Sequence, residues 1–156
     1  MPSTTAISDF LTAEFPQTKC KVVAAGNMGA TIRHEVGDAE LRPGGTVSGP
    51  VLMTVADVAL YVALMGEIGI VPLMVTTNLS INFLRKPPAD RAIVGVCKLM
   101  KVGRTLATGE VALYSEGLDE PVAHVVGTYA LPRRDVGRLP QADERPTESV
   151  AQKNSR

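Results

Sequence analysis

The feature that most constrains the fold is a run of apolar residues near the middle of the chain, Pro50 to Gly66. Its spacing predicts a helix over about 50–66, and because apolar side chains occupy nearly all of its faces, the helix should lie inside the protein. Pro50 suits the first helical position, where its missing N–H is harmless. The run is shorter than the ~20 apolar residues of a membrane span and is interrupted by Asp57. We therefore expect a core helix and no membrane partner.

Asp57 stands out because it is one of only two charged residues between Gly44 and Leu84, the other being Glu67. We expect its carboxylate to be buried, which costs several kcal/mol unless partners compensate. It lies too far into the helix to be a cap, and no Lys or Arg stands within two turns of it. Buried acids serve either structural or catalytic roles, so Asp57 is the first candidate site residue.

Length and composition favour a single domain. The chain has 156 residues, of which 45% are hydrophobic, and 16 basic residues balance 16 acidic ones. This composition suits one globular domain over residues 1–132, with a polar tail over 133–156, and it offers no overall charge to attract nucleic acid. Cys20 and Cys97 form neither a disulfide framework nor a metal site, and the N-terminus has no leader-like pattern, so we expect a cytoplasmic protein without a metal or cofactor.

Periodicity and turn residues predict the remaining elements. Helical spacing marks residues 7–15, and the expected strands are 21–25, 30–36, 75–84, 93–102, 106–115 and 122–131, with a long loop over 37–49. Alternation in the strand over 75–84 places Val75, Thr77, Leu79 and Ile81 on one face and Thr76 on the other. Short connections between the last strands predict an antiparallel meander. The expected fold class is α+β, with a curved antiparallel sheet wrapped around the central helix.

Three segments together resemble one family. They run from Arg42 to Asp57, from Val75 to Arg85 and from Gly103 to Leu106. In combination they are similar to the hotdog-fold acyl-CoA thioesterases of the phenylacetate-pathway (PaaI-like) type. The resemblance covers about residues 21–132 and implies hydrolysis of an acyl-CoA thioester by water, with CoA as part of the substrate and not a cofactor.

The resemblance also implies roles for individual residues across a homodimer interface. The N–H of Gly49 would polarise the thioester carbonyl, Asp57 of the other chain would drive the attack, and Thr76 would assist with its hydroxyl. Arg42 stands where many relatives have Asn, and Ser48 stands where they have His. These two positions belong to the candidate site, although they depart from the family pattern.

Elementary geometry supports this assignment independently. A helix N-terminus presents unpaired N–H groups and partial positive charge, which suits a developing oxyanion at Gly49. Gly49 and Asp57 are about 12 Å apart along a helix, at about 1.5 Å per residue, whereas carbonyl and water must meet at about 3 Å. Two antiparallel copies resolve this conflict, so we expect a homodimer. We also expect a dimer of dimers, for which the sequence leaves back-to-back and face-to-face pairing open. Asp57 would act as general base or as nucleophile, and we favour the base.

Candidate substrate contacts follow from charge and apolarity. Between Arg85 and Arg104 the chain has six cations against one anion, which suits CoA phosphates. Arg85, Lys86 and Arg104 are the candidates, with solvated strand ends as the alternative, and Gly103 marks a turn or a close approach of CoA. Leu52 and Tyr61 are candidates for the acyl pocket, which would accept aryl or aliphatic groups.

Two other functional classes are consistent with parts of the sequence. A hotdog protein that binds acyl-CoA without turnover is favoured by the departures at Arg42 and Ser48. A hotdog hydratase or dehydratase would need a histidine on the central helix, which has none. His34 and His124 fall in predicted strands without evident partners, so neither is assigned to a metal site or a catalytic triad.

Overall fold

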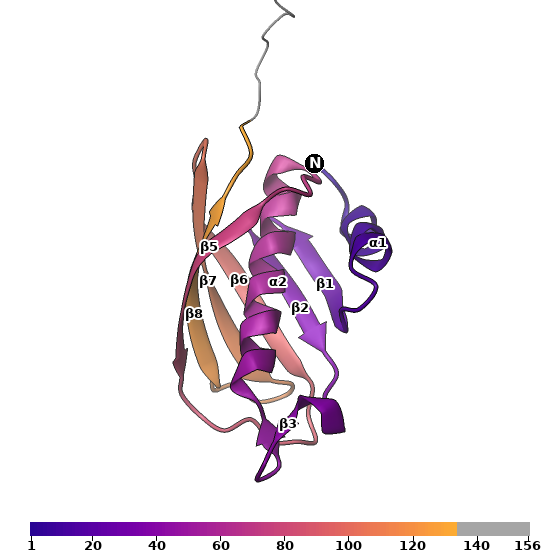
Figure 1. Ribbon diagram of the computed structural model, residues 1–156, viewed down its shortest axis with the longest axis vertical. Helices are drawn as coiled ribbons and strands as arrows, with labels where there is room; N and C mark the ends of the chain where they lie inside the picture. Colours follow the sequence, from indigo (N-terminus) through magenta and orange to yellow (C-terminus); the bar gives the residue numbers. More distant parts are fainter. Residues whose placement is uncertain (134–156) are drawn as a thin grey trace, which may run out of the picture.

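The computed structural model describes residues 1–133 of the chain. Its main feature is a six-stranded antiparallel sheet curved around one long helix, α2 (Gly49–Ile68). Figure 1 shows α2 along the concave side of the sheet, with α1 (Thr4–Glu14) beside the β1 edge. This is the expected α+β architecture. Apart from Arg133, the tail predicted from residue 133 onward lies outside the described residues.

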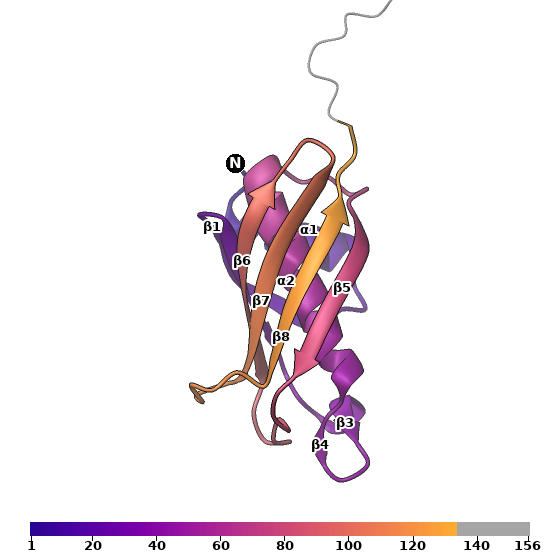
Figure 2. The ribbon, with the colours of Figure 1, turned by 90° about the vertical axis from the view of Figure 1, so that its left-hand side faces the viewer.

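The six strands follow the order β1, β2, β6, β7, β8, β5 across the sheet. Their bounds are β1 (Cys20–Gly26), β2 (Gly29–His34), β5 (Val75–Phe83), β6 (Ile93–Val102), β7 (Leu106–Ser115) and β8 (Ala123–Ala130). The predicted meander is confirmed for β6, β7 and β8. Strand β5 pairs with β8 at the sheet's far edge, and because β2 occupies the outer edge of β6, the connection from β5 to β6 passes the ends of β8 and β7 (Figure 2).

The β1–β2 hairpin has the short turn that the sequence indicates. Gly26 pairs with Gly29, and the two residues between them, Asn27 and Met28, have φ values of 52° and 60°. Two successive left-handed residues are typical of a type I′ hairpin turn. The backbone N–H of Met28 donates to Glu67 Oε1 at 2.6 Å. Glu67, the second charge of the apolar region, therefore ties the end of α2 to this turn.

The segment before α2 is more ordered than the long loop that the sequence predicted. It contains a 3-10 turn, η1 (Asp38–Glu40), and a small hairpin of two-residue strands, β3 (Leu41–Arg42) and β4 (Thr46–Val47). Strands this short carry no detectable alternation, so the sequence shows only the Gly and Pro of the turns. The hairpin leads the chain directly into the first turn of α2.

Helix α2 packs closely on the sheet because glycines line its path. Gly109 and Gly127 lie opposite each other on β7 and β8, and the side chain of Leu60 rests over both. A methyl group on Gly127 would stand 2.5 Å from Leu60 Cδ1, so only glycine permits this approach. These glycines thereby let α2, which carries Asp57, lie close against β7 and β8.

The other face of α2 is less covered than expected. Met53 is 38% exposed and Asp57 is half-buried, because the sheet of one chain encloses only one side of the helix. Among the described helices, only α2 has the length and mean hydropathy of a helix that could cross a membrane. In its most apolar stretch of 18 residues, 61% is buried within the fold. The expectation that the whole helix is enclosed by its own chain is therefore wrong.

Candidate active site

The carboxylate of Asp57 is held by two hydroxyl groups from the sheet. Thr76 Oγ1 donates to Asp57 Oδ1 at 2.7 Å, and the Tyr129 hydroxyl lies 2.6 Å from the same oxygen. The Tyr129 hydroxyl also lies 2.9 Å from the main-chain carbonyl oxygen of Asp57. The sequence indicated no cation near Asp57, and the structure shows that neutral donors take that place. The sequence predicts a buried carboxylate, whereas the structure leaves the Asp57 side chain half-buried.

A β-bulge aims Thr76 at the helix. Thr76 lies directly opposite Tyr129, but the register shifts between Thr76 and Asn78. The extra residue, Thr77, breaks the alternation, because a bulge reverses which face the following residues occupy. The predicted strand faces are therefore wrong at this end of β5, and Thr76 shares the inner side with Leu79.

Asp57 opens onto a cleft of about 360 Å³ between α1, α2 and the start of β5. Most of its wall is apolar, with Leu11, Phe15, Val58, Tyr61, Pro72 and Met74 as the main contributors. Phe15 meets Tyr61 edge-on at a centroid separation of 6.0 Å. A largely apolar cleft with a few converging polar groups at one place is typical of a small-molecule site. Tyr61, expected in the acyl pocket, lies in this wall.

The start of α2 lines a second cleft of about 370 Å³, which shares no lining residue with the first. Gly49 lies there with Leu52 and with three cationic side chains, those of Arg42, Arg85 and Lys86. Leu52 is thus separated from Tyr61, although both were expected in one acyl pocket. The Arg85 guanidinium also pairs with Glu120 at 3.0 Å and is about half-exposed.

Gly49 packs closely against Phe83. A methyl group at this position would stand 3.1 Å from the tip of the Phe83 ring, so the ring, which is 54% exposed, would have to shift by a few tenths of an ångström. Ser48 is the N-cap of α2, but its side chain makes no capping hydrogen bond. Ser48 contributes instead through its backbone, because its N–H donates to the Glu40 carbonyl at 2.9 Å.

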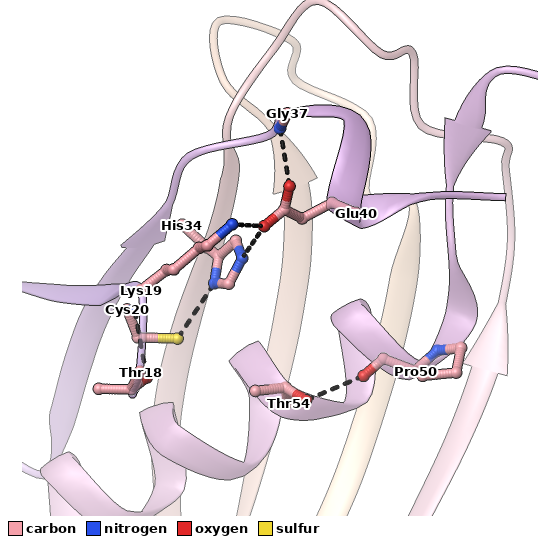
Figure 3. A network of polar contacts seen from close by, with 8 residues as sticks. All are labelled: Thr18, Lys19, Cys20, His34, Gly37, Glu40, Pro50 and Thr54. Atoms are coloured by element: carbon pink, nitrogen blue, oxygen red, sulfur yellow. Dashed lines mark hydrogen bonds and ion pairs between the residues drawn. The ribbon is translucent and has the colours of Figure 1, made fainter. Parts of the chain in front are cut away.

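Glu40 anchors the segment that leads into α2. Its carboxylate accepts from Lys19 Nζ at 2.7 Å and from the Gly37 N–H at 2.8 Å, and it lies 3.4 Å from His34 Nε2 (Figure 3). These donors, Lys19 foremost and the Gly37 N–H next, lower the pKa of Glu40 from 4.5 to about 2. An ionised Glu40 therefore fixes the turn whose carbonyl holds Ser48.

The same cluster gives His34 the partners that the sequence did not reveal. Cys20 Sγ lies 3.4 Å from His34 Nδ1, so Cys20, His34 and Glu40 form a chain of contacts. Burial raises the pKa of the Cys20 thiol, which keeps it in the unreactive protonated form. His124 pairs with Glu110 at 3.1 Å. Within residues 1–133, no group of three or more His, Cys, Asp or Glu residues is arranged to hold a metal ion.

The remaining predicted residues, Gly103 and Arg104, lie in the β6–β7 turn. Gly103 serves that turn, because its N–H donates to the Leu106 carbonyl at 2.8 Å and a side chain there would collide with the same oxygen. The turn is at the opposite end of the sheet from the connection that carries Arg85 and Lys86 (Figure 2). One chain therefore does not bring these four candidates together.

Tyr129 and Glu40 are the residues that sequence reasoning missed. Tyr129 was placed within the last strand without a role, since nothing local distinguishes it from an ordinary inward-facing strand residue. Its alignment with Thr76 depends on the pairing of β5 with β8, which the sequence did not indicate. The only sequence signal for Glu40 is that it is an acidic residue within a Gly-rich segment.

Comparisons with known proteins converge on one family. The model of the thioesterase superfamily matches residues 44–122. A candidate thioesterase from Silicibacter sp. TM1040 is 41% identical, with a TM-score of 0.77 over 83% of this chain and 92% of that one. Among curated proteins, no sequence matches this chain.

Two more distant structures share the fold. Thioesterase superfamily member 2 of zebrafish has a TM-score of 0.75 at 21% identity, over 85% of this chain and all of that one. A variant of the phenylacetic acid degradation protein PaaI from Thermus thermophilus has a TM-score of 0.64 at 24% identity, over 78% of this chain and 97% of that one. The expected hotdog architecture is confirmed by these matches.

Proposed function

Since this chain belongs to the thioesterase superfamily and is a thioester hydrolase, we propose that its substrates are acyl-CoA or aryl-CoA thioesters and that Asp57 activates the attacking water. The observation that carries the proposal is the Asp57 carboxylate, fixed by two hydroxyl donors in the wall of a largely apolar cleft. Acid and CoA would be the products.

Asp57 is arranged to act as a general base. Within residues 1–133, the hydrogen bonds to its carboxylate all go to Oδ1, which leaves Oδ2 to accept a proton from water. The water oxygen forms the new bond to the thioester carbon, and Asp57 takes the water proton. When the carbon–sulfur bond breaks, that proton passes to the departing CoA thiolate.

The carbonyl would be polarised at the start of α2. The first N–H groups of a helix lack internal partners and carry partial positive charge, so they stabilise an oxyanion. Gly49 lies at this position, beside Arg42, Arg85 and Lys86, whose charges suit the phosphates of CoA. The second cleft thus offers helix N–H groups for the carbonyl and cationic side chains for the phosphates, two features that the Asp57 cleft lacks.

The separation of the two clefts supports a site shared between two chains. Gly49 and Asp57 are eight residues apart on α2, about 12 Å, and cannot act on one carbonyl. A second copy can pair along the exposed edge of β5, a nine-residue strand whose other side is bonded to β8. An antiparallel two-fold pairing sets the α2 start of one protomer against the middle of α2 in its partner. Further pairing into a dimer of dimers is part of the same proposal.

Thiol release from a panel of aryl, short-chain and medium-chain CoA thioesters tests the activity. Asp57→Asn should lower kcat by about 100-fold to 10,000-fold while the protein stays folded, because the base is lost and the side-chain shape is retained. Saturable binding without release in the wild type would instead support a non-catalytic acyl-CoA-binding protein. After a single turnover in H₂¹⁸O, label in Asp57 would establish an anhydride intermediate attacked by water at the Asp57 carbon and would overturn the general-base role.

Mixed dimers test the shared site. Asp57→Asn and Gly49→Val proteins should each be inactive, and co-expression should restore about a quarter of wild-type activity, since half of the dimers are mixed and each then has one intact site. If both residues served a site within one chain, no activity would return. Light scattering on the same samples reports whether they are dimers or tetramers.

A further inference from the structure

Tyr129 occupies a defined place beside the proposed base. It is on β8, directly opposite Thr76 on β5, and is only 3% exposed. Its hydroxyl lies 2.6 Å from Asp57 Oδ1 and 2.9 Å from the Asp57 carbonyl oxygen. The single hydroxyl proton therefore bridges the side chain and the main chain of the same residue.

The surroundings of Tyr129 keep this hydroxyl in place and protonated. Its ring stacks on that of Tyr61, with centroids 6.3 Å apart and planes inclined by 23°. Burial, followed by the charge of Asp57, raises the pKa of Tyr129 far above its ordinary value of 10. The hydroxyl thus remains a donor at any pH at which the enzyme works.

We propose that Tyr129 is a positioning residue that orients the Asp57 carboxylate, so that Oδ1 is engaged by Tyr129 and Thr76 while Oδ2 faces the cleft. This inference rests on the proposed function, because it assigns Tyr129 a role through Asp57 and no contact with substrate. The bridge to the Asp57 carbonyl ties the carboxylate to the backbone of α2, which limits the rotamers of the side chain.

Tyr129→Phe removes the hydroxyl and keeps the stacked ring. We expect kcat to fall about 10-fold to 100-fold with KM changed less than about threefold, because the substrate keeps its contacts. A role in packing alone would not confine the loss to kcat. Tyr114→Phe is the matched control: Tyr114 is half-buried on β7, outside both clefts, and this variant should keep the wild-type kcat and KM.

The variants distinguish failure of this inference from failure of the proposed function. If Asp57→Asn works as fast as wild type, the base assignment fails and the role of Tyr129 falls with it. If Asp57→Asn is inactive but Tyr129→Phe keeps the wild-type kcat, only the inference about Tyr129 is overturned. The Asp57→Asn/Tyr129→Phe double variant should be no slower than Asp57→Asn, whereas a further loss would mean that Tyr129 touches the substrate.

A second measurement covers the case in which Tyr129→Phe does not fold. The chain has three tyrosines, so in a Tyr61→Phe/Tyr114→Phe background a fluorinated tyrosine enters only position 129. Fluorination makes the phenol a stronger donor with little change in shape. Because the altered donor acts on the Asp57 carboxylate, kcat should then differ from that of the unlabelled background protein while KM stays the same. An unchanged kcat would overturn the proposal.

Discussion

Replacing Gly127 by alanine should push α2 away from the sheet. This displacement should both destabilise the protein and slow the reaction. The new methyl group would stand 2.5 Å from Leu60 Cδ1 and 3.0 Å from Leu79 Cδ1, distances that side chains cannot keep. Overpacking of this kind costs about 1–3 kcal/mol of unfolding free energy. Restriction of the unfolded chain by alanine returns only about 0.4–1 kcal/mol. We therefore expect a net loss of about 1–2 kcal/mol.

The loss should depend on Leu60, because Leu60 is the side chain that the methyl group meets. Leu60→Ala alone should cost about 2–5 kcal/mol by leaving a cavity. In that background Gly127→Ala fills part of the space, so its own cost should vanish or change sign. Tyr129 follows Gly127 by two residues on the same face of β8. Pushing α2 outward lengthens the contact from Tyr129 to Asp57, so kcat should fall with Gly127→Ala and recover in the double variant.

Urea unfolding followed by circular dichroism, at one protein concentration, measures the stability of the wild type, Gly127→Ala, Leu60→Ala and the double variant. Thiol release measures the kcat of the same four proteins. Gly37→Ala is the control, since Gly37 has an extended backbone with φ of −132° and its added methyl group would meet only Glu40 Oε2 at 3.6 Å. That variant should be as stable as wild type or slightly more so. An unchanged midpoint for Gly127→Ala, or an equal cost with and without Leu60, would refute the packing argument.

Three further predictions concern charge and pH. The pKa of Glu40 is lowered to about 2, so its ionised form contributes stability that is present above about pH 4.5 and lost as the pH falls toward 2. Glu40→Gln should cost roughly 1.5–3 kcal/mol at pH 7, and urea titrations should show the difference from wild type shrinking between pH 4.5 and 2. Burial raises the pKa of Cys97 to about 12 and raises that of Cys20, so mass spectrometry should find neither alkylated by iodoacetamide in the folded protein at pH 8 and both alkylated in urea. The Arg85→Ala/Lys86→Ala variant should raise KM for CoA thioesters about 10-fold at low salt, yet leave KM unchanged for an N-acetylcysteamine thioester, which has no phosphates; equal effects on both would exclude phosphate recognition.

Elements with strong local patterns could be predicted from the sequence. The apolar run after Pro50 specifies α2 within two residues at either end, and regular alternation specifies β6, β7 and β8. The Asn27–Met28 turn is specified by short-range backbone preference. In each case the interactions that determine the structure join residues of one element or one hairpin. These residues are close in the sequence, so a local pattern predicts the structure.

The site depended on contacts that no local pattern encodes. Asp57 could be found because a charge within an apolar run is conspicuous. The inward turn of Thr76 results from a single inserted residue, and its alignment with Tyr129 results from the pairing of two strands about 50 residues apart. Half-burial of Asp57 likewise reflects how much of α2 one sheet can cover.

In the Asp57 cleft, the residues that carry out the reaction and those that select the acyl group belong to different parts of the fold. The groups around the carboxylate come from α2, β5 and β8, which also form the core, so changes there carry a stability penalty. Part of the opposite wall comes from α1, which buries only Ile7 and Leu11 and is joined to the sheet through Pro16. Phe15, which directly follows α1 and is 40% exposed, can therefore be substituted with little effect on folding, whereas Leu11 belongs to the core. Evolution, or a directed library confined to position 15, could change which acyl groups are accepted while leaving the hydrolytic centre intact.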